Sequence, residues 1–283
     1  MLKEKLIKKQ PLDGKVVIVS GGSTGMGKAT AKNIVQLGGS VCIIARNTEN
    51  LKKAVKEIES LKTNDKQFIE MISCDTTKME QLKPLLTEFI EKHGIPDYLF
   101  NFVGFAIPNY IENLVLDDFK IHINGNYYGQ LIPTLIILPY FMKAKKGFIS
   151  FTSSLVCYYP MMGYAMYTPA KFAILGLAEV LRNELKPYNL NFSVLFPSDT
   201  NTPAFAKENE TKPKECLMMS ERSKIYSPEE IADPFIEGIL KKKFMILPGV
   251  SKLAWRMFRH FPKLVRWIID RDLQKVRKKI GKE

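Results

Sequence analysis

The sequence contains little that would build a metal site, a disulfide framework or a membrane span. It has three histidines and four scattered cysteines, Cys42, Cys74, Cys157 and Cys216, with no Cys-x-x-Cys spacing. That pattern excludes a cysteine-rich zinc module and favours a reduced, intracellular setting. The longest apolar run, residues 131–142, is too short to cross a bilayer and contains two prolines. The N-terminus also lacks the apolar stretch and cleavage site of a signal peptide.

Positive charge is present in excess but is confined to the two ends of the chain. The net charge is +13, yet residues 241–283 hold fourteen Lys and Arg against three acids. Residues 1–10 add four lysines against one acid, which leaves 24 basic and 25 acidic residues, of 42 and 29 in total, for positions 11–240. A neutral body with basic ends argues against nucleic acid as a partner.

Short apolar segments alternate with helical patterns along most of the chain. The predicted strands are 15–20, 41–45, 68–73, 98–102, 148–152, 192–196 and 244–247, and the predicted helices are 25–37, 48–61, 78–92, 116–143 and 163–186. This order predicts an α/β fold: a Rossmann-type, doubly wound parallel sheet of about seven strands with helices on both faces. We expect a basic segment over 1–11, one domain over 12–250 and a helical tail over 251–283. Residues 197–226 hold three prolines and mixed charge, and they are predicted to form a long loop, of the kind that often acts as a lid.

A glycine-rich segment directly follows the first predicted strand. Gly21, Gly25 and Gly27 have the spacing G-x-x-x-G-x-G and precede a predicted helix. Glycines there allow a tight turn and let the backbone approach a pyrophosphate at the helix N-terminus. An ordinary strand-to-helix turn is the alternative. The context favours a dinucleotide site.

The end of the second predicted strand indicates which dinucleotide binds. The sequence there is Ala45-Arg46-Asn47, with no acid before Glu49. A ribose hydroxyl favours a carboxylate at this place, whereas a 2′-phosphate favours a cation. Arg46, with Ser23 and Asn47 as hydrogen-bond donors, therefore favours NADPH/NADP+. The alternative is a solvated surface arginine.

Tyr167 and Lys171 lie one helical turn apart, and Ser154 precedes the tyrosine by thirteen residues. A nearby ammonium lowers the pKa of a phenol and makes it a usable proton donor near neutral pH. The pair alone occurs by chance in many helices. Ser153 and Tyr164 are the competing hydroxyls. Because Pro169 lies between the pair, we expect the helix to begin near Tyr164, with Pro169 in its first turn.

Taken together, these motifs resemble the short-chain dehydrogenase/reductase family over residues 12 to about 247. The resemblance implies a catalytic tetrad of Asn126, Ser154, Tyr167 and Lys171, with Asn124 as a weaker rival to Asn126. Ser198 stands where the family usually has glycine, and Phe102-Val103 where it has Asn-Ala. The implied cofactor-binding residues are Gly21, Ser23, Gly25, Met26, Gly27, Arg46, Asn47, Asp75, Asn101, Gly104, Tyr167, Lys171, Pro197, Thr200 and Thr202.

Within the family, residues 196–213 and 171–179 resemble reductases that act on the C3 ketone of a long-chain sphingoid base. Another lipidic ketone or aldehyde is the alternative substrate, and a non-catalytic binder is a remote one. Residues 157–163 are aromatic and methionine-rich, which suits the wall of an alkyl pocket, although core packing explains them as well.

The basic tail is predicted to form two amphipathic helices broken at Pro262. Its cations and its tryptophans fit an anionic membrane surface, and packing on the enzyme or on a second subunit is the alternative. We therefore expect a peripheral membrane protein on the cytosolic face, at the endoplasmic reticulum in a eukaryote. The family resemblance also implies a homodimer or homotetramer, with helices 116–143 and 163–186 as contact surfaces.

Overall fold

The computed structural model describes residues 2–221 and 223–281, and its centre is a seven-stranded, all-parallel sheet. The strand order is β3-β2-β1-β4-β5-β6-β7, which confirms the predicted doubly wound fold. The strands are β1 (Val16–Ser20), β2 (Ser40–Ala45), β3 (Ile69–Ser73), β4 (Tyr98–Asn101), β5 (Gly147–Thr152), β6 (Leu190–Leu195) and β7 (Met245–Ile246). Because the order reverses between β1 and β4, the switch point places a ligand crevice at their carboxyl ends.

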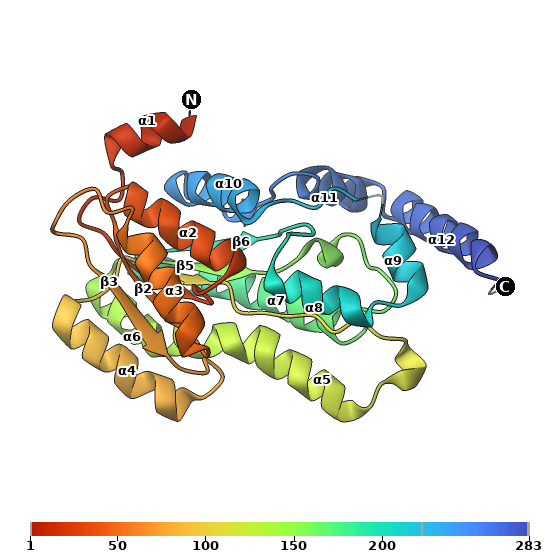
Figure 1. Cartoon of the computed structure of the whole chain (residues 1–283), viewed down its shortest axis with the longest axis horizontal. Helices are drawn as coiled ribbons and strands as arrows, with labels where there is room; N and C mark the ends of the chain where they lie inside the picture. Colours follow the sequence, from red (N-terminus) through yellow and green to blue (C-terminus); the bar gives the residue numbers. More distant parts are fainter. Residues whose placement is uncertain (1, 222, 282–283) are drawn as a thin grey trace.

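Helices cover both faces of the sheet (Figure 1). One face is covered by α2 (Gly25–Gln36), α3 (Thr48–Glu59) and α10 (Pro228–Leu240), and the other by α4 (Met79–His93), α6 (Gly129–Ala144) and α7 (Tyr167–Glu184). Alternate residues of a strand pack into the two hydrophobic cores, one on each face of the sheet. Val17 and Val19 pack on the α2 side, and Ile18 packs on the α6 side. The apolar runs of the sequence therefore reflect burial on both faces.

The long helix predicted over 116–143 is divided into three parts. It comprises α5 (Leu116–Ile123), a π-helical turn at Asn124–Tyr128 and then α6. Such turns insert one extra residue and occur often at functional sites. Here the turn carries Asn126, which is completely buried.

The segment 197–226 is not the irregular loop that the sequence predicts. It contains α8 (Pro203–Thr211), which Thr202 caps by accepting a hydrogen bond from the Phe205 amide at 3.1 Å, and α9 (Lys214–Ser220). Pro203 at the first helical position and Thr202 at the N-cap are a helix-start signal. The prolines were therefore wrongly interpreted as marks of a loop.

The ends of the chain form helices outside the sheet (Figure 1). These are α1 (Leu2–Lys9), α11 (Ser251–His260) and α12 (Pro262–Lys279), with the predicted break at Pro262. Within residues 2–221 and 223–281, no helix combines the length and apolar character needed to cross a membrane.

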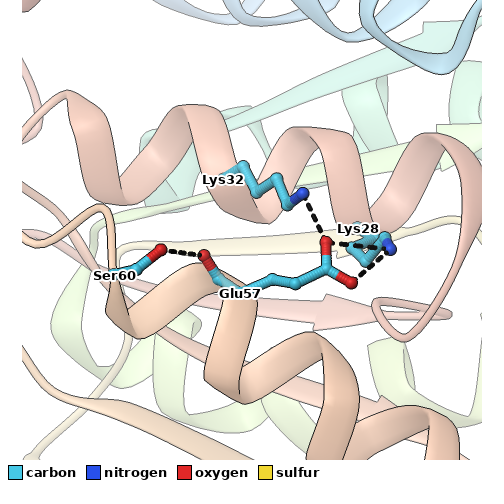
Figure 2. Close-up of polar contacts among 4 residues, drawn as sticks. All are labelled: Lys28, Lys32, Glu57 and Ser60. Carbon is cyan, nitrogen blue, oxygen red and sulfur yellow. Dashed lines mark hydrogen bonds and ion pairs between the residues drawn. The ribbon is translucent and has the colours of Figure 1, made fainter.

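An ion-pair cluster joins α2 to α3, the helices that follow the glycine-rich turn and Arg46 (Figure 2). The Glu57 carboxylate accepts hydrogen bonds from Lys32 at 2.5 Å and from Lys28 at 3.0 Å, and these lysines lower the pKa of Glu57. The Ser60 hydroxyl donates to the Glu57 carbonyl oxygen at 2.9 Å. Because the carboxylate is 43% exposed, each pair contributes only about 0.2–1 kcal/mol.

Candidate active site

Two adjoining clefts open at the carboxyl edge of the sheet. The first, of about 280 Å³, lies beside the glycine-rich turn. Of the predicted cofactor residues it is lined by Gly21, Ser23, Gly25, Met26, Gly27, Arg46, Asn47, Asp75, Gly104 and Thr202. Pro197 and Thr200 line the second cleft together with Thr202, which borders both. Asn101 lines neither cleft, because its amide points into the core and donates to the Thr134 hydroxyl at 3.3 Å.

The glycines of the turn are required by close packing. A Cβ at Gly27 would lie 2.2 Å from the carbonyl oxygen of Gly21, and one at Gly25 would lie 2.8 Å from the Thr202 methyl carbon. Gly25 also has a positive φ of 54°, which other residues rarely adopt. Any side chain at position 27 would push the turn away from the helix that it leads into.

The N-terminus of α2 opens into this first cleft and suits an anion. Its N-cap residue, Thr24, makes no side-chain capping bond, and the first turn carries no acid. The first amide groups of a helix lack partners within the helix, and the helix dipole favours negative charge at this end. The cradle therefore fits the pyrophosphate of a dinucleotide.

Arg46 lies at the outer edge of the same cleft, where its side chain is 75% exposed. One guanidinium nitrogen is 3.9 Å from the Asp75 carboxylate. Asp75 is itself held by Thr77, whose amide and hydroxyl donate at 2.9 and 2.8 Å. The Asn47 side-chain oxygen is already used to cap α3, through the Asn50 amide at 2.8 Å, so only its amide nitrogen is available as a donor.

The second cleft, of about 180 Å³, brings Ser154, Tyr167 and Lys171 together. Ser154 follows β5, and the other two lie one turn apart at the start of α7. The Lys171 amine is 5.3 Å from the centre of the Tyr167 ring and donates to the Thr152 carbonyl at 3.1 Å. Helix α7 begins at Tyr167 with Pro169 as its third residue, which confirms the predicted helix start.

The competing hydroxyls are engaged elsewhere. Ser153 donates to the main-chain carbonyl of Lys171 at 2.9 Å, and Tyr164 donates to the Glu208 carboxylate at 2.5 Å. Ser154, in contrast, hydrogen-bonds to Tyr167. The geometry therefore favours Ser154 and Tyr167 as the reacting pair.

The electrostatics of the pair differ from the sequence prediction. Burial and the negative charge of Glu208 raise the pKa of Tyr167, and the Ser154 hydrogen bond offsets this only in part. Lys171 does not lower it, because burial lowers the pKa of Lys171 itself to about 7. The expectation of a depressed tyrosine pKa is wrong for the protein alone, since desolvation outweighs the lysine.

Asn126 uses its whole side-chain amide to hold the main chain. Its oxygen accepts from the Phe105 amide at 3.0 Å, and its nitrogen donates to the carbonyls of Phe105 and His122 at 2.9 and 3.1 Å. A Cβ at Gly104 would lie 2.8 Å from the Asn126 oxygen and 2.7 Å from the Lys171 amine. Asn126 thus sets the position of the loop that borders Lys171.

The residues between Ser154 and Tyr167 lie partly along the second cleft and partly in the hydrophobic core. Tyr159 and Met161 line the second cleft, as the alkyl-pocket interpretation predicts. Cys157 and Tyr158 are buried, and Tyr158 packs on Phe196, as the core interpretation predicts.

Three charged residues near the tyrosine were not predicted as site residues. Asp199 and Glu208 line the second cleft, and Lys212 pairs with Glu208 at 3.1 Å. All three lie within residues 196–213, which the sequence analysis uses only for the family resemblance.

Comparison with known proteins agrees with this geometry. A model of the short chain dehydrogenase family matches residues 15–213. The chain is 37% identical over 242 residues to a 3-dehydrosphinganine reductase of Danio rerio, covering 84% of this chain and 73% of the relative. It is 36% identical to a 3-ketodihydrosphingosine reductase of Dictyostelium discoideum, covering 81% and 72%.

Solved structures share the fold at lower identity. Levodione reductase superposes with a TM-score of 0.76 at 18% identity, covering 86% of this chain and 99% of that one. A 3-oxoacyl-[acyl-carrier protein] reductase from Brucella melitensis gives 0.71 at 20% identity, covering 83% and 87%. With its parallel sheet, glycine-rich turn and Ser-Tyr-Lys cleft, the chain belongs to the short-chain dehydrogenase family.

Proposed function

We propose that this protein reduces the keto group of 3-ketodihydrosphingosine to give dihydrosphingosine, with NADPH as the electron donor. The observation that carries the proposal is the second cleft, where Ser154, Tyr167 and Lys171 meet beside the glycine-rich turn. Relatives named for this reaction, at 36–37% identity over most of the chain, support the choice of substrate.

The mechanism assigns separate tasks to the three side chains. NADPH, when bound, supplies the hydride. The Ser154 hydroxyl donates a hydrogen bond to the ketone oxygen and stabilises the negative charge that develops there. Tyr167 gives its proton to that oxygen. Its raised pKa keeps the phenol protonated at neutral pH, which is the form that a reduction requires. Lys171, with a pKa of about 7, can take up or release a proton beside it.

A larger cavity beside the catalytic cleft supports a long-chain substrate. Met161 and Tyr164 border both the catalytic cleft and this cavity, which has a volume of about 780 Å³. The larger cavity is lined by apolar residues, among them Pro160, Met162 and Ile111, and by polar ones, among them Glu112, Glu215 and Arg277 of α12. An alkyl chain attached to a ketone at Tyr167 would extend from the small cleft into this cavity.

A substrate panel tests the proposed reaction. With saturating NADPH and a range of concentrations of each ketone, we expect 3-ketodihydrosphingosine to give a higher kcat/KM than 3-oxoacyl, steroid and retinoid carbonyls. The measurement is the loss of NADPH absorbance together with identification of the alcohol. Absence of turnover with 3-ketodihydrosphingosine refutes the proposal, and turnover of another carbonyl would establish the alternative substrate class.

Arg46 supports NADPH over NADH, because it offers a cation at the edge of the dinucleotide cleft. We expect Arg46→Asp to raise KM for NADPH by roughly 10- to 100-fold, the value of a charge-assisted hydrogen bond, and to lower KM for NADH. The matched control is Lys53→Asp, an exposed cation on α3 that does not line the cleft. An unchanged NADPH preference in Arg46→Asp would show that this arginine is merely solvated.

The tail supports a membrane contact through the apolar side chains that it leaves exposed. Val265, Ile269 and Val276 of α12 are buried, and α12 packs against α9, so the packing alternative holds for these three side chains. Leu253, Phe261, Leu264 and Trp267 remain 43–64% exposed. We define these four residues as the apolar tail patch. Exposed cations adjoin them on the same two helices, as an anionic bilayer surface requires.

Substitution of the patch tests this contact without removing helices that pack on the domain. We expect the triple variant Leu253→Gln, Phe261→Gln, Trp267→Gln to lose most of its co-sedimentation with vesicles of anionic phospholipid. Val115→Gln with Leu116→Gln is the matched control, because these side chains are 64% and 69% exposed at the start of α5, outside the two tail helices. Equal binding by the tail variant and the wild type would refute the contact.

Exposed apolar side chains on α5, α6 and α7 support self-association. Ile121, Leu135, Phe172 and Val180 are 45–58% exposed on these helices. Apolar helix faces of this kind are commonly covered in homo-oligomers. We propose a homodimer or homotetramer through them, which sedimentation velocity of the purified chain would detect.

A further inference from the structure

Two carboxylates line the catalytic cleft and have no task in the mechanism above. Asp199 lies beyond the end of β6, and Glu208 lies on α8. Both act electrostatically on Tyr167, Glu208 more strongly than Asp199, which places them close to the reacting phenol. An apolar ketone with no charge near its carbonyl would gain nothing from acids at this place.

Among the described residues, Lys212 is the cation that acts on both acids, whereas Lys224, which also lines the cleft, pairs with Glu230 at 2.6 Å. Glu208 accepts a hydrogen bond from the Tyr164 hydroxyl at 2.5 Å, and the Lys212 amine lies 3.1 Å from the same carboxylate oxygen. The Lys212 side chain is fully buried, and its amine lies 4.3 Å from the centre of the Phe205 ring. Lys212 is therefore engaged with Glu208 and Phe205.

Asp199 is the less satisfied of the two acids. Within the part of the chain that the structure describes, no hydrogen bond or salt bridge reaches its carboxylate, and Lys212 acts on it only at longer range. Burial raises the pKa of both Asp199 and Glu208, which shows that negative charge is costly in the unliganded cleft. A buried carboxylate without a partner is unfavourable unless a ligand supplies one.

The substrate of the proposed reaction carries the missing charge. In 3-ketodihydrosphingosine an amine is bonded to the carbon next to the ketone, so it lies beside the carbonyl that Tyr167 and Ser154 bind. We propose that Asp199 and Glu208 bind this ammonium group and so select 2-amino ketones over uncharged ketones. The inference rests on the proposed function and adds the residues that determine specificity.

Binding of the amine has a second consequence for the reaction. An ammonium between the carboxylates and Tyr167 offsets the negative charge that raises the pKa of the phenol. The proton then leaves Tyr167 more readily once the correct substrate is bound. The two acids thereby link recognition of the amine to proton donation.

The experiment compares two ketones in matched variants. The ketones are 3-ketodihydrosphingosine and its deamino analogue, which has a hydrogen in place of the amine. For Asp199→Asn and Glu208→Gln, we expect kcat/KM for the aminoketone to fall about tenfold or more, the value of a hydrogen bond between charged groups. For the deamino analogue, kcat/KM should change much less or should rise. Asp117→Asn, an exposed acid on α5, is the control that should retain the wild-type preference.

Each outcome decides a different point. If both ketones lose activity equally in Asp199→Asn, the acid has a structural role and the inference fails while the proposed function stands. If the wild type does not reduce the aminoketone, the proposed function fails and the inference fails with it. Because Glu208→Gln also removes the partner of Lys212, retained NADPH binding in that variant is the check that it folds. Asp199→Asn breaks no hydrogen bond or salt bridge among the described residues and so gives the cleaner result.

Discussion

Replacing Tyr167 with phenylalanine is expected to lower kcat for ketone reduction by about 10²- to 10⁴-fold, the usual contribution of a positioned general acid. The substitution removes one oxygen from a ring that is held in the first turn of α7, next to Ser154 and Lys171. The cleft keeps its shape, so binding of NADPH should weaken far less than kcat falls. Steady-state rates and NADPH fluorescence titration on the same preparation separate the two effects.

Tyr158→Phe is the matched control, because it makes the same change in another buried tyrosine. The Tyr158 hydroxyl has no hydrogen-bond partner within the described residues, and its ring packs on Phe196 and Phe258. Removing an unsatisfied buried hydroxyl is neutral or stabilising, so this variant should keep wild-type activity. Full activity in Tyr167→Phe would contradict the assignment of the proton donor.

The sequence predicted the sheet well because its central strands are buried on both faces. β1 and β2 read as continuous apolar runs, and a helical pattern follows each of them, which leaves few alternatives to a parallel sheet. The prediction from sequence failed where a proline is compatible with either a loop or the start of a helix. Pro203 and Pro213 suggested a loop, yet the first opens α8 and the second precedes α9.

The site was partly predictable for a similar reason. Residues with a fixed spacing on one element, such as Tyr167 and Lys171, are visible in the sequence because the helix sets their geometry. Glu208 and Lys212 also have an i,i+4 spacing, but it was missed because this segment was predicted to be a loop. Asp199 lines the same cleft as Glu208 only through the packing of α8 over it, which no spacing reveals. The sign of the Tyr167 pKa shift was wrong because burial, which the sequence does not show, outweighs the neighbouring amine.

Lys171 gives the second large expected effect, and it concerns stability as well as rate. Burial lowers the pKa of Lys171 to about 7, from 10.5 for the exposed side chain. Between these values the unfolded chain binds a proton that the folded protein does not, so the free energy of unfolding rises with pH. Below pH 7 both states are protonated and the full cost of burying the ammonium remains. Each pH unit within the window is worth at most roughly 1.4 kcal/mol.

Without NADPH, the wild type should therefore gain roughly 2 kcal/mol of stability relative to Lys171→Met between pH 7 and pH 9, as measured by urea unfolding. Other titrating groups, such as the buried cysteines, affect both proteins alike and cancel in the difference. Lys171→Met should also lose most of its ketone reduction, because the proton beside Tyr167 is gone. Parallel pH profiles for the two proteins would mean that water reaches the amine and keeps it charged. In that case Lys171 would act on Tyr167 as a fixed cation and not as a group that takes up and releases the proton.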